Sequence, residues 1–103
     1  MEGMKYYFYE YIWVDNGEHE YYSNAVISCH ESEDVEKLIN EKILARMWGD
    51  ATKKEGDYYY SPDMDIAVSL RGMKEVSKTE FNVLKQFLIY YTFMPEPEKI
   101  IFT

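Results

Sequence analysis

Apolar and polar residues alternate most regularly in the first 29 residues, on either side of the dipeptide Asn16-Gly17. Asn-Gly supplies the two positive-φ residues that a two-residue type I′ turn requires. The flanking segments, 4–14 and 18–29, are rich in Tyr, Ile, Val, Phe and Trp, which is typical of strands. The pattern therefore predicts an antiparallel β-hairpin that turns at Asn16 and Gly17.

A two-residue loop also predicts which side chains share a face, because successive strand residues point to opposite sides. One face mixes aliphatic and small residues, and we expect the first helix to cover it as part of the core. A one-residue change of register, from a bulge for example, would exchange the faces over the far half of the hairpin. The expected core face consists of Met4, Tyr6, Phe8, Glu10, Ile12, Val14, His19, Tyr21, Ser23, Ala25, Ile27 and Cys29.

Two helices are predicted from apolar residues spaced three and four apart. The first follows Ser32, a favourable N-cap residue, and ends near Gly49. The second begins at Ser77, which forms a capping box with Glu80. Its apolar stripe leads into the run 87–94, which is apolar nearly all round and is followed by prolines that end a helix.

The remaining segments complete an α+β pattern. Residues 49–57 are polar and without periodicity, which predicts a loop, and 58–60 with 64–71 read as a second strand pair. The expected order is ββαββα, with a four-stranded antiparallel sheet, two helices packed on it and a short C-terminal extension in which 99–103 could pair as a strand. A chain of 103 residues has the length of one domain, so we expect residues 1–103 to form a single α+β domain.

The net charge of −8 is concentrated in the first third of the chain. Residues 1–36 contain nine acids and one base, Lys5, whereas residues 37–103 contain ten of each. Such a surface repels phosphates, which argues against direct nucleic-acid binding and against anionic membranes. Its expected partner is a basic protein. The alternative is an acidic face that only aids solubility.

Candidate catalytic and metal-binding residues are few. Cys29 and His30 are neighbours at a strand end, and His19 lies about 33 Å away along the strand, so these residues cannot hold one ion. Glu10 is the one carboxylate expected on the core face, where burial would raise its pKa and suit it to acid-base chemistry. No phosphate-binding loop, dinucleotide fingerprint or paired-cysteine zinc motif occurs. We therefore expect no cofactor, no metal and no enzymatic activity.

The second hairpin face is unusual because tyrosines dominate it. Amphipathic rings of this kind are enriched in protein interfaces. Nucleic-acid platforms add a cationic groove to such rings, whereas the surroundings here are acidic. Three interpretations stay open: the second helix or the tail covers this face, the face is exposed and binds a partner protein or a second copy, or it is a platform for a small ligand or nucleic acid. With the acids beside the turn, the candidate binding residues are Tyr7, Tyr9, Tyr11, Trp13, Glu18, Glu20 and Tyr22.

These observations favour a small, acidic, non-enzymatic protein-binding domain that engages a basic, nucleic-acid-binding partner and could form a homodimer. In size, acidity and aromatic content the chain resembles the small inhibitors and adaptors of phages and mobile elements, a likeness of composition that includes no motif. A single cysteine is compatible with a cytoplasmic location. The alternative function is a small enzyme or ligand-binding domain with a pocket that uses Glu10 or tyrosine hydroxyls.

Overall fold

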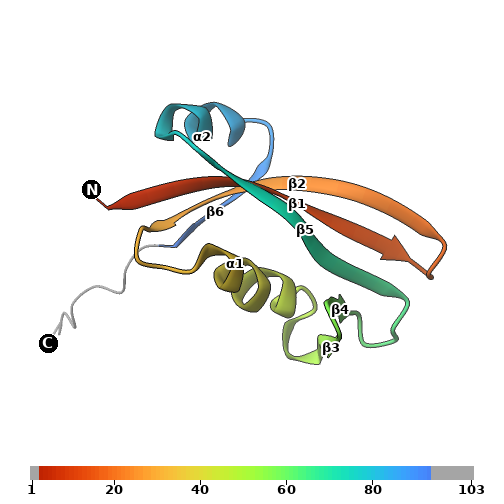
Figure 1. Ribbon diagram of the computed structural model, residues 1–103. Coiled ribbons are helices and arrows are strands. Elements are labelled where there is room, and N and C mark those ends of the chain that lie inside the picture. The colour runs from red at the N-terminus through yellow and green to blue at the C-terminus, as the bar shows by residue number, and fades with distance from the viewer. Residues whose placement is uncertain (1–2, 94–103) are drawn as a thin grey trace, which may run out of the picture.

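The computed structural model describes residues 3–93, which form one twisted mixed sheet with helical segments on both of its faces (Figure 1). The sheet has six strands in the order β3-β4-β5-β1-β2-β6. The strands are β1 (Met4–Asp15), β2 (His19–His30), β3 (Lys53–Glu55), β4 (Tyr58–Tyr60), β5 (Ile66–Val76) and β6 (Ile89–Phe93). The helical segments are α1 (Val35–Leu38), η1 (Ile39–Ile43), η2 (Leu44–Arg46), η3 (Gly49–Ala51) and α2 (Lys78–Leu84).

The expected four-stranded antiparallel sheet is wrong, although the α+β class holds. β3 forms within the segment predicted as a loop, and β6 forms where the apolar run after α2 was read as helix. β6 pairs with β2 in parallel, which makes the sheet mixed. Its sequence, Ile-Tyr-Tyr-Thr-Phe, consists of β-branched and aromatic residues that suit a strand once the edge of β2 is available. The predicted strand at 99–103 lies outside the described residues.

The predicted hairpin is confirmed, but its predicted register is wrong by one residue. Asn16 and Gly17 have φ values of 54° and 70°, and the Glu18 N–H donates to the Asp15 carbonyl at 3.0 Å. Asp15 lies opposite His19, so three residues separate the paired strands instead of two. Each β2 residue therefore shares a face with the β1 residues that the prediction had placed on the opposite face.

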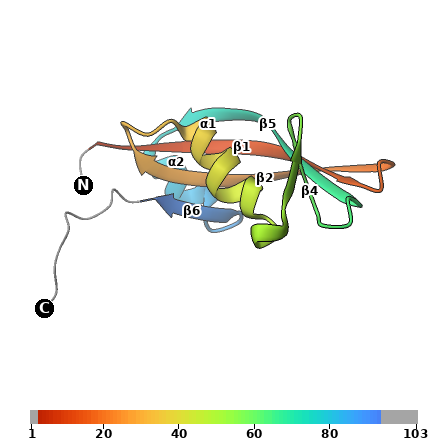
Figure 2. The same ribbon diagram turned by 90° about the horizontal axis from the view of Figure 1, so that it is seen from below.

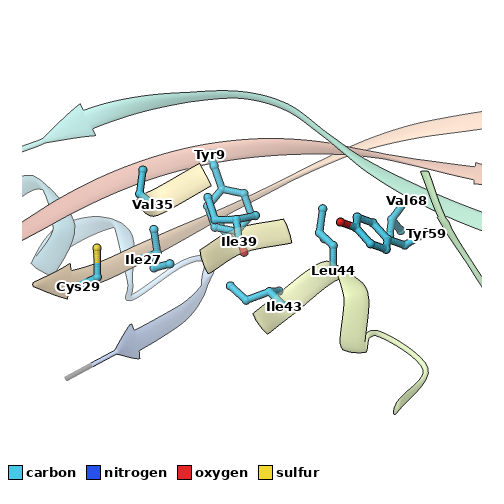
Figure 3. Close-up of a cluster of buried hydrophobic side chains, with 10 residues drawn as sticks. Tyr9, Ile27, Cys29, Val35, Ile39, Ile43, Leu44, Tyr59 and Val68 are labelled. Atoms are coloured by element: carbon cyan, nitrogen blue, oxygen red, sulfur yellow. The ribbon is translucent and has the colours of Figure 1, made fainter. Parts of the chain in front are cut away.

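The changed register places Tyr9 in the core, with Tyr7 and Tyr11 packed against it. Tyr9 lies opposite Ala25 and beside Ile27, on the face that α1, η1 and η2 cover, as Figures 2 and 3 show. The predicted core face is thus correct for β2 and wrong for β1. The buried cluster consists of Tyr9, Ala25, Ile27, Cys29, Val35, Ile39, Ile43, Leu44, Tyr59 and Val68.

The first helical segment runs continuously from Val35 to Arg46, with α1 passing into the π-helical turn η1 and then into the 3₁₀ turn η2. Asp34, not Ser32, is its N-cap, since the Asp34 carboxylate accepts from the Lys37 N–H at 3.2 Å. The Ser32 hydroxyl bonds instead to His30 Nδ1 at 2.7 Å.

The second helix, α2, lies on the opposite face of the sheet (Figure 1). The predicted capping box of Ser77 and Glu80 is present. Phe81 packs against Tyr6 at a ring-centroid distance of 5.2 Å and is buried. The helix ends at Leu84, before the apolar run that was expected to continue it.

The predicted pairing of residues 58–60 with the following strand is confirmed. Tyr59 lies opposite Val68 and Tyr60 opposite Ala67. β5 continues to Val76 along β1, with a bulge where the register shifts between Glu10 and Tyr11.

Candidate functional site

Four of the seven predicted binding residues lie on the face of the sheet that α1, η1 and η2 cover. Tyr9 is 1% exposed, and Tyr7, Tyr11 and Trp13 are half-buried against the same core. Trp13 packs on Trp48 with ring centroids 6.1 Å apart. Burial gives these four side chains a packing role, and it leaves little of Tyr9 for a partner to contact.

The other three predicted residues lie around the turn or on the opposite face. Glu18 is in the turn, whereas Glu20 and Tyr22 lie opposite Val14 and Ile12 on the face that carries α2. All three are exposed, Tyr22 by 58%. The structure thus separates the predicted site into a packed group and an accessible group at the hairpin end.

A second turn joins the accessible group. The N–H of Asn16 donates to the carbonyl of Asp65 at 2.7 Å, which holds the β4–β5 turn beside the hairpin turn. The sequence has no Lys or Arg in residues 6–36 or in residues 55–70. We call this end of the sheet the acidic end; its acids are Asp15, Glu18, Glu20, Asp63 and Asp65.

The β4–β5 turn is held by its own hydrogen bonds. The buried Ser61 accepts from the Ile66 N–H at 3.1 Å and donates its hydroxyl to Asp63 at 2.6 Å. That hydroxyl, together with the N–H of Asp65, holds the pKa of the Asp63 carboxyl below its usual value. Asp63 therefore stays ionised at neutral pH and adds a fixed negative charge to the acidic end.

A groove of about 380 Å³ crosses the acidic end on the face that carries α2. One row of cross-strand neighbours passes through it: Ala67 lies opposite Tyr60 on one side and Val14 on the other. Val14 in turn lies opposite Glu20. Small side chains thus lie between a tyrosine and a carboxylate. The full lining is Val14, Asn16, Gly17, Glu20, Tyr58, Tyr60, Met64, Asp65 and Ala67.

The charged side chains of this lining are Glu20 and Asp65, both exposed acids. On the wall, Tyr58 and Tyr60 stand with ring centroids 6.2 Å apart. The guanidinium carbon of Arg71 lies 5.2 Å from the centroid of the Tyr58 ring, and the guanidinium donates a hydrogen bond to the Tyr58 hydroxyl. The protein therefore already places one guanidinium on this tyrosine pair.

The residues considered for catalysis are not brought together. Glu10 is half-buried opposite Asn24, not Ser23, and is not among the residues that line the groove at the acidic end. Cys29 is buried, and that burial raises the pKa of its thiol. His19 is exposed at the turn. Residues 3–93 contain no group of three or more His, Cys, Asp or Glu side chains placed to hold a metal ion.

Sequence reasoning missed the contribution of the second turn. Residues 58–60 and 64–71 were read only as strands, so Tyr60 and Met64 were not among the candidate binding residues. The available signal was the absence of basic residues from both turn segments. Their proximity depends on the pairing of β5 with β1, which joins residues about 50 positions apart in the sequence.

Comparison with known proteins adds no relative: no protein-family model, no curated protein and no solved structure matches this chain. Within the described part of the chain, no helix is long and apolar enough to cross a membrane.

Proposed function

We propose that this protein is a non-enzymatic protein-binding domain whose acidic end engages a basic protein. The observation that carries the proposal is the hydrogen bond between Asn16 and Asp65, because it joins two turns that contain acids and no base. Opposite potentials steer association and select partners, whereas like charge rejects other acidic surfaces and phosphates.

Aromatic exposure at the same end supports a protein partner. Tyr21 and Tyr22 are 54% and 58% exposed on the two faces of the hairpin. Tyrosine buries a large area on binding at a low entropic cost and keeps a polar hydroxyl, which is why it is frequent in interfaces. A basic, nucleic-acid-binding protein fits both the charge and the rings, and an inhibitory role would follow if the acidic end covers that protein's cationic surface.

The single cysteine, Cys29, is compatible with a reducing compartment, and we propose a cytoplasmic location.

Affinity capture at several salt concentrations tests the proposal. The immobilised chain should retain proteins of high isoelectric point. This retention should fall steeply as the NaCl concentration rises from about 50 to about 300 mM, because salt screens the attraction between exposed charges. The double variant Glu18→Lys/Glu20→Lys should lose this retention, because it replaces two negative charges at the acidic end with positive ones.

A matched control changes the net charge equally at another place. Glu31 and Glu33 are exposed beyond the far end of β2, about 35 Å from the turn along the strand. Glu31→Lys/Glu33→Lys should retain the basic proteins nearly as well as the unmodified chain. Equal losses in both double variants, or capture that does not depend on salt, would contradict an interface at the acidic end.

A further inference from the structure

We propose that the groove at the acidic end receives an arginine side chain of the partner, with its guanidinium against the tyrosine wall and between the Glu20 and Asp65 carboxylates. The inference rests on the proposed function and names the partner group that the groove recognises.

The shape of the groove suits a long side chain with an apolar stem. Its floor contains Ala67, which is 5% exposed, and Val14. These short side chains leave a depression in the sheet surface between the longer side chains of Tyr60 and Glu20. An arginine stem can lie on such a floor while its charged head stays near carboxylates.

The charge of the groove selects a cation, since its charged lining side chains are Glu20 and Asp65. Lys53, opposite Tyr60 on β3, is not among the lining residues. A planar guanidinium can both stack on a ring and donate to a carboxylate, whereas an ammonium is a compact charge. The guanidinium carbon of Arg71 already lies 5.2 Å from the ring centroid of Tyr58, the neighbour of Tyr60 in the wall.

Met64 supplies independent support from its backbone. It has a φ of 65°, a conformation that costs an ordinary residue energy and that Gly or Asn would adopt more easily. Its side chain is nevertheless 40% exposed and lines the groove. Strained conformations are often found at functional sites. The exposed Met64 side chain thus offers an apolar contact to the stem of the bound side chain.

The test uses an octa-arginine peptide as the probe, titrated into the isotope-labelled full chain and followed by NMR. The backbone amides of Asn16, Gly17 and Ala67 should shift on binding. An octalysine peptide of equal charge should bind about two- to fivefold more weakly, the range expected from loss of one exposed cation–π contact.

Two variants examine the wall of the groove. Tyr60→Leu removes the ring but keeps an apolar strand residue, and Met64→Gly removes the apolar side chain of Met64 from the groove lining while relieving the turn. Each should weaken octa-arginine binding about two- to fivefold. Tyr90→Leu, which removes an exposed ring from β6 at the opposite edge of the sheet, is the matched control and should leave the affinity unchanged.

The outcomes separate the inference from the proposed function. If octa-arginine binds in a salt-sensitive manner and Glu18→Lys/Glu20→Lys weakens it, but Tyr60→Leu and Met64→Gly do not, the groove is not the receptor while the acidic end still binds. Equal affinities for octa-arginine and octalysine overturn the choice of arginine. No binding of either peptide overturns both proposals. Because Met64→Gly should not destabilise the fold, weaker binding by this variant cannot be ascribed to unfolding.

Discussion

Met64 combines an exposed apolar side chain with a left-handed backbone, and each feature is normally avoided in a turn. The turn itself is fixed by Ser61, whose carbonyl accepts from the Met64 N–H at 2.8 Å. Within this hydrogen-bonded turn the backbone at Met64 has a φ of 65°. Glycine would adopt it without the steric cost that a Cβ imposes.

We expect Met64→Gly to raise the free energy of unfolding by up to about 1 kcal/mol, measured by urea denaturation. Met73→Gly is the matched control, because Met73 is 39% exposed but lies in β5 with no positive φ. There the same change should destabilise by about 1 kcal/mol, since glycine loses more backbone entropy in a strand. Equal effects of the two substitutions would show that the turn is not strained.

The helical segment from Val35 to Arg46 shows how local and tertiary preferences are combined in one element. Its N-terminal cap is local: Asp34 accepts from Lys37, two positions after the expected cap at Ser32. Its middle is decided by packing, because the π-helical turn η1 carries Ile39 and Ile43, which are both buried against the sheet. Side-chain spacing alone indicated a helix here, and it did not indicate the change of helical pitch.

The two cap assignments differ in their stability effects. Asp34→Ala should lower the free energy of unfolding by about 1 kcal/mol, because it leaves the Lys37 N–H without its carboxylate acceptor. Ser32→Ala removes only an exposed hydrogen bond to His30 and should change it by less than about 0.5 kcal/mol. Urea unfolding of both variants measures the difference, and a larger loss for Ser32→Ala would restore the assignment made from the sequence.

The molecule as a whole separates its charge from its buried tyrosines. Among the acids of residues 3–36, three lie at the hairpin turn and three in the connection after β2, with Glu10 in β1 and Glu36 in α1. Tyr7, Tyr9 and Tyr11 of β1 face α1, η1 and η2. Burial raises the pKa of the Tyr9 phenol above its ordinary value of 10.0, and the nearby Tyr91 and Tyr11 phenolates would raise it further. Burial also raises the pKa of Tyr59 and of Tyr91.

These shifts predict a loss of stability at alkaline pH. A group with a raised pKa in the folded state binds its proton more tightly there, so its stabilisation is complete below pH about 10 and falls as the pH rises further. Tyr9→Phe should therefore flatten this fall. At neutral pH it should be neutral or stabilising, because the Tyr9 hydroxyl has no hydrogen-bond partner among the described residues.

Urea unfolding at pH 7, 9 and about 11 measures this dependence. Tyr21→Phe is the control, since Tyr21 is 54% exposed, and this variant should follow the unmodified chain. An unchanged alkaline slope in Tyr9→Phe would contradict the assignment of the loss to the buried phenol.

Features that depend on neighbouring residues were predictable from the sequence alone. The Asn16-Gly17 turn, the capping box at Ser77 and the strand at 58–60 each follow from backbone conformations and hydrogen bonds within a few positions, and all three are present. The acidic charge of the hairpin turn is equally local. The tyrosine row was also recognised, but its environment was not.

Tertiary pairing decided the remaining features. One residue of register determined that Tyr9 faces the core, because strand side chains alternate with a period of two. The identity of β6 as a strand depended on β2, which precedes it by about 60 positions, and the groove depended on two turns brought together by β5. In each case the favourable partner lies far away in the sequence, so the local pattern fits two outcomes and the contact energy of the folded chain selects one of them.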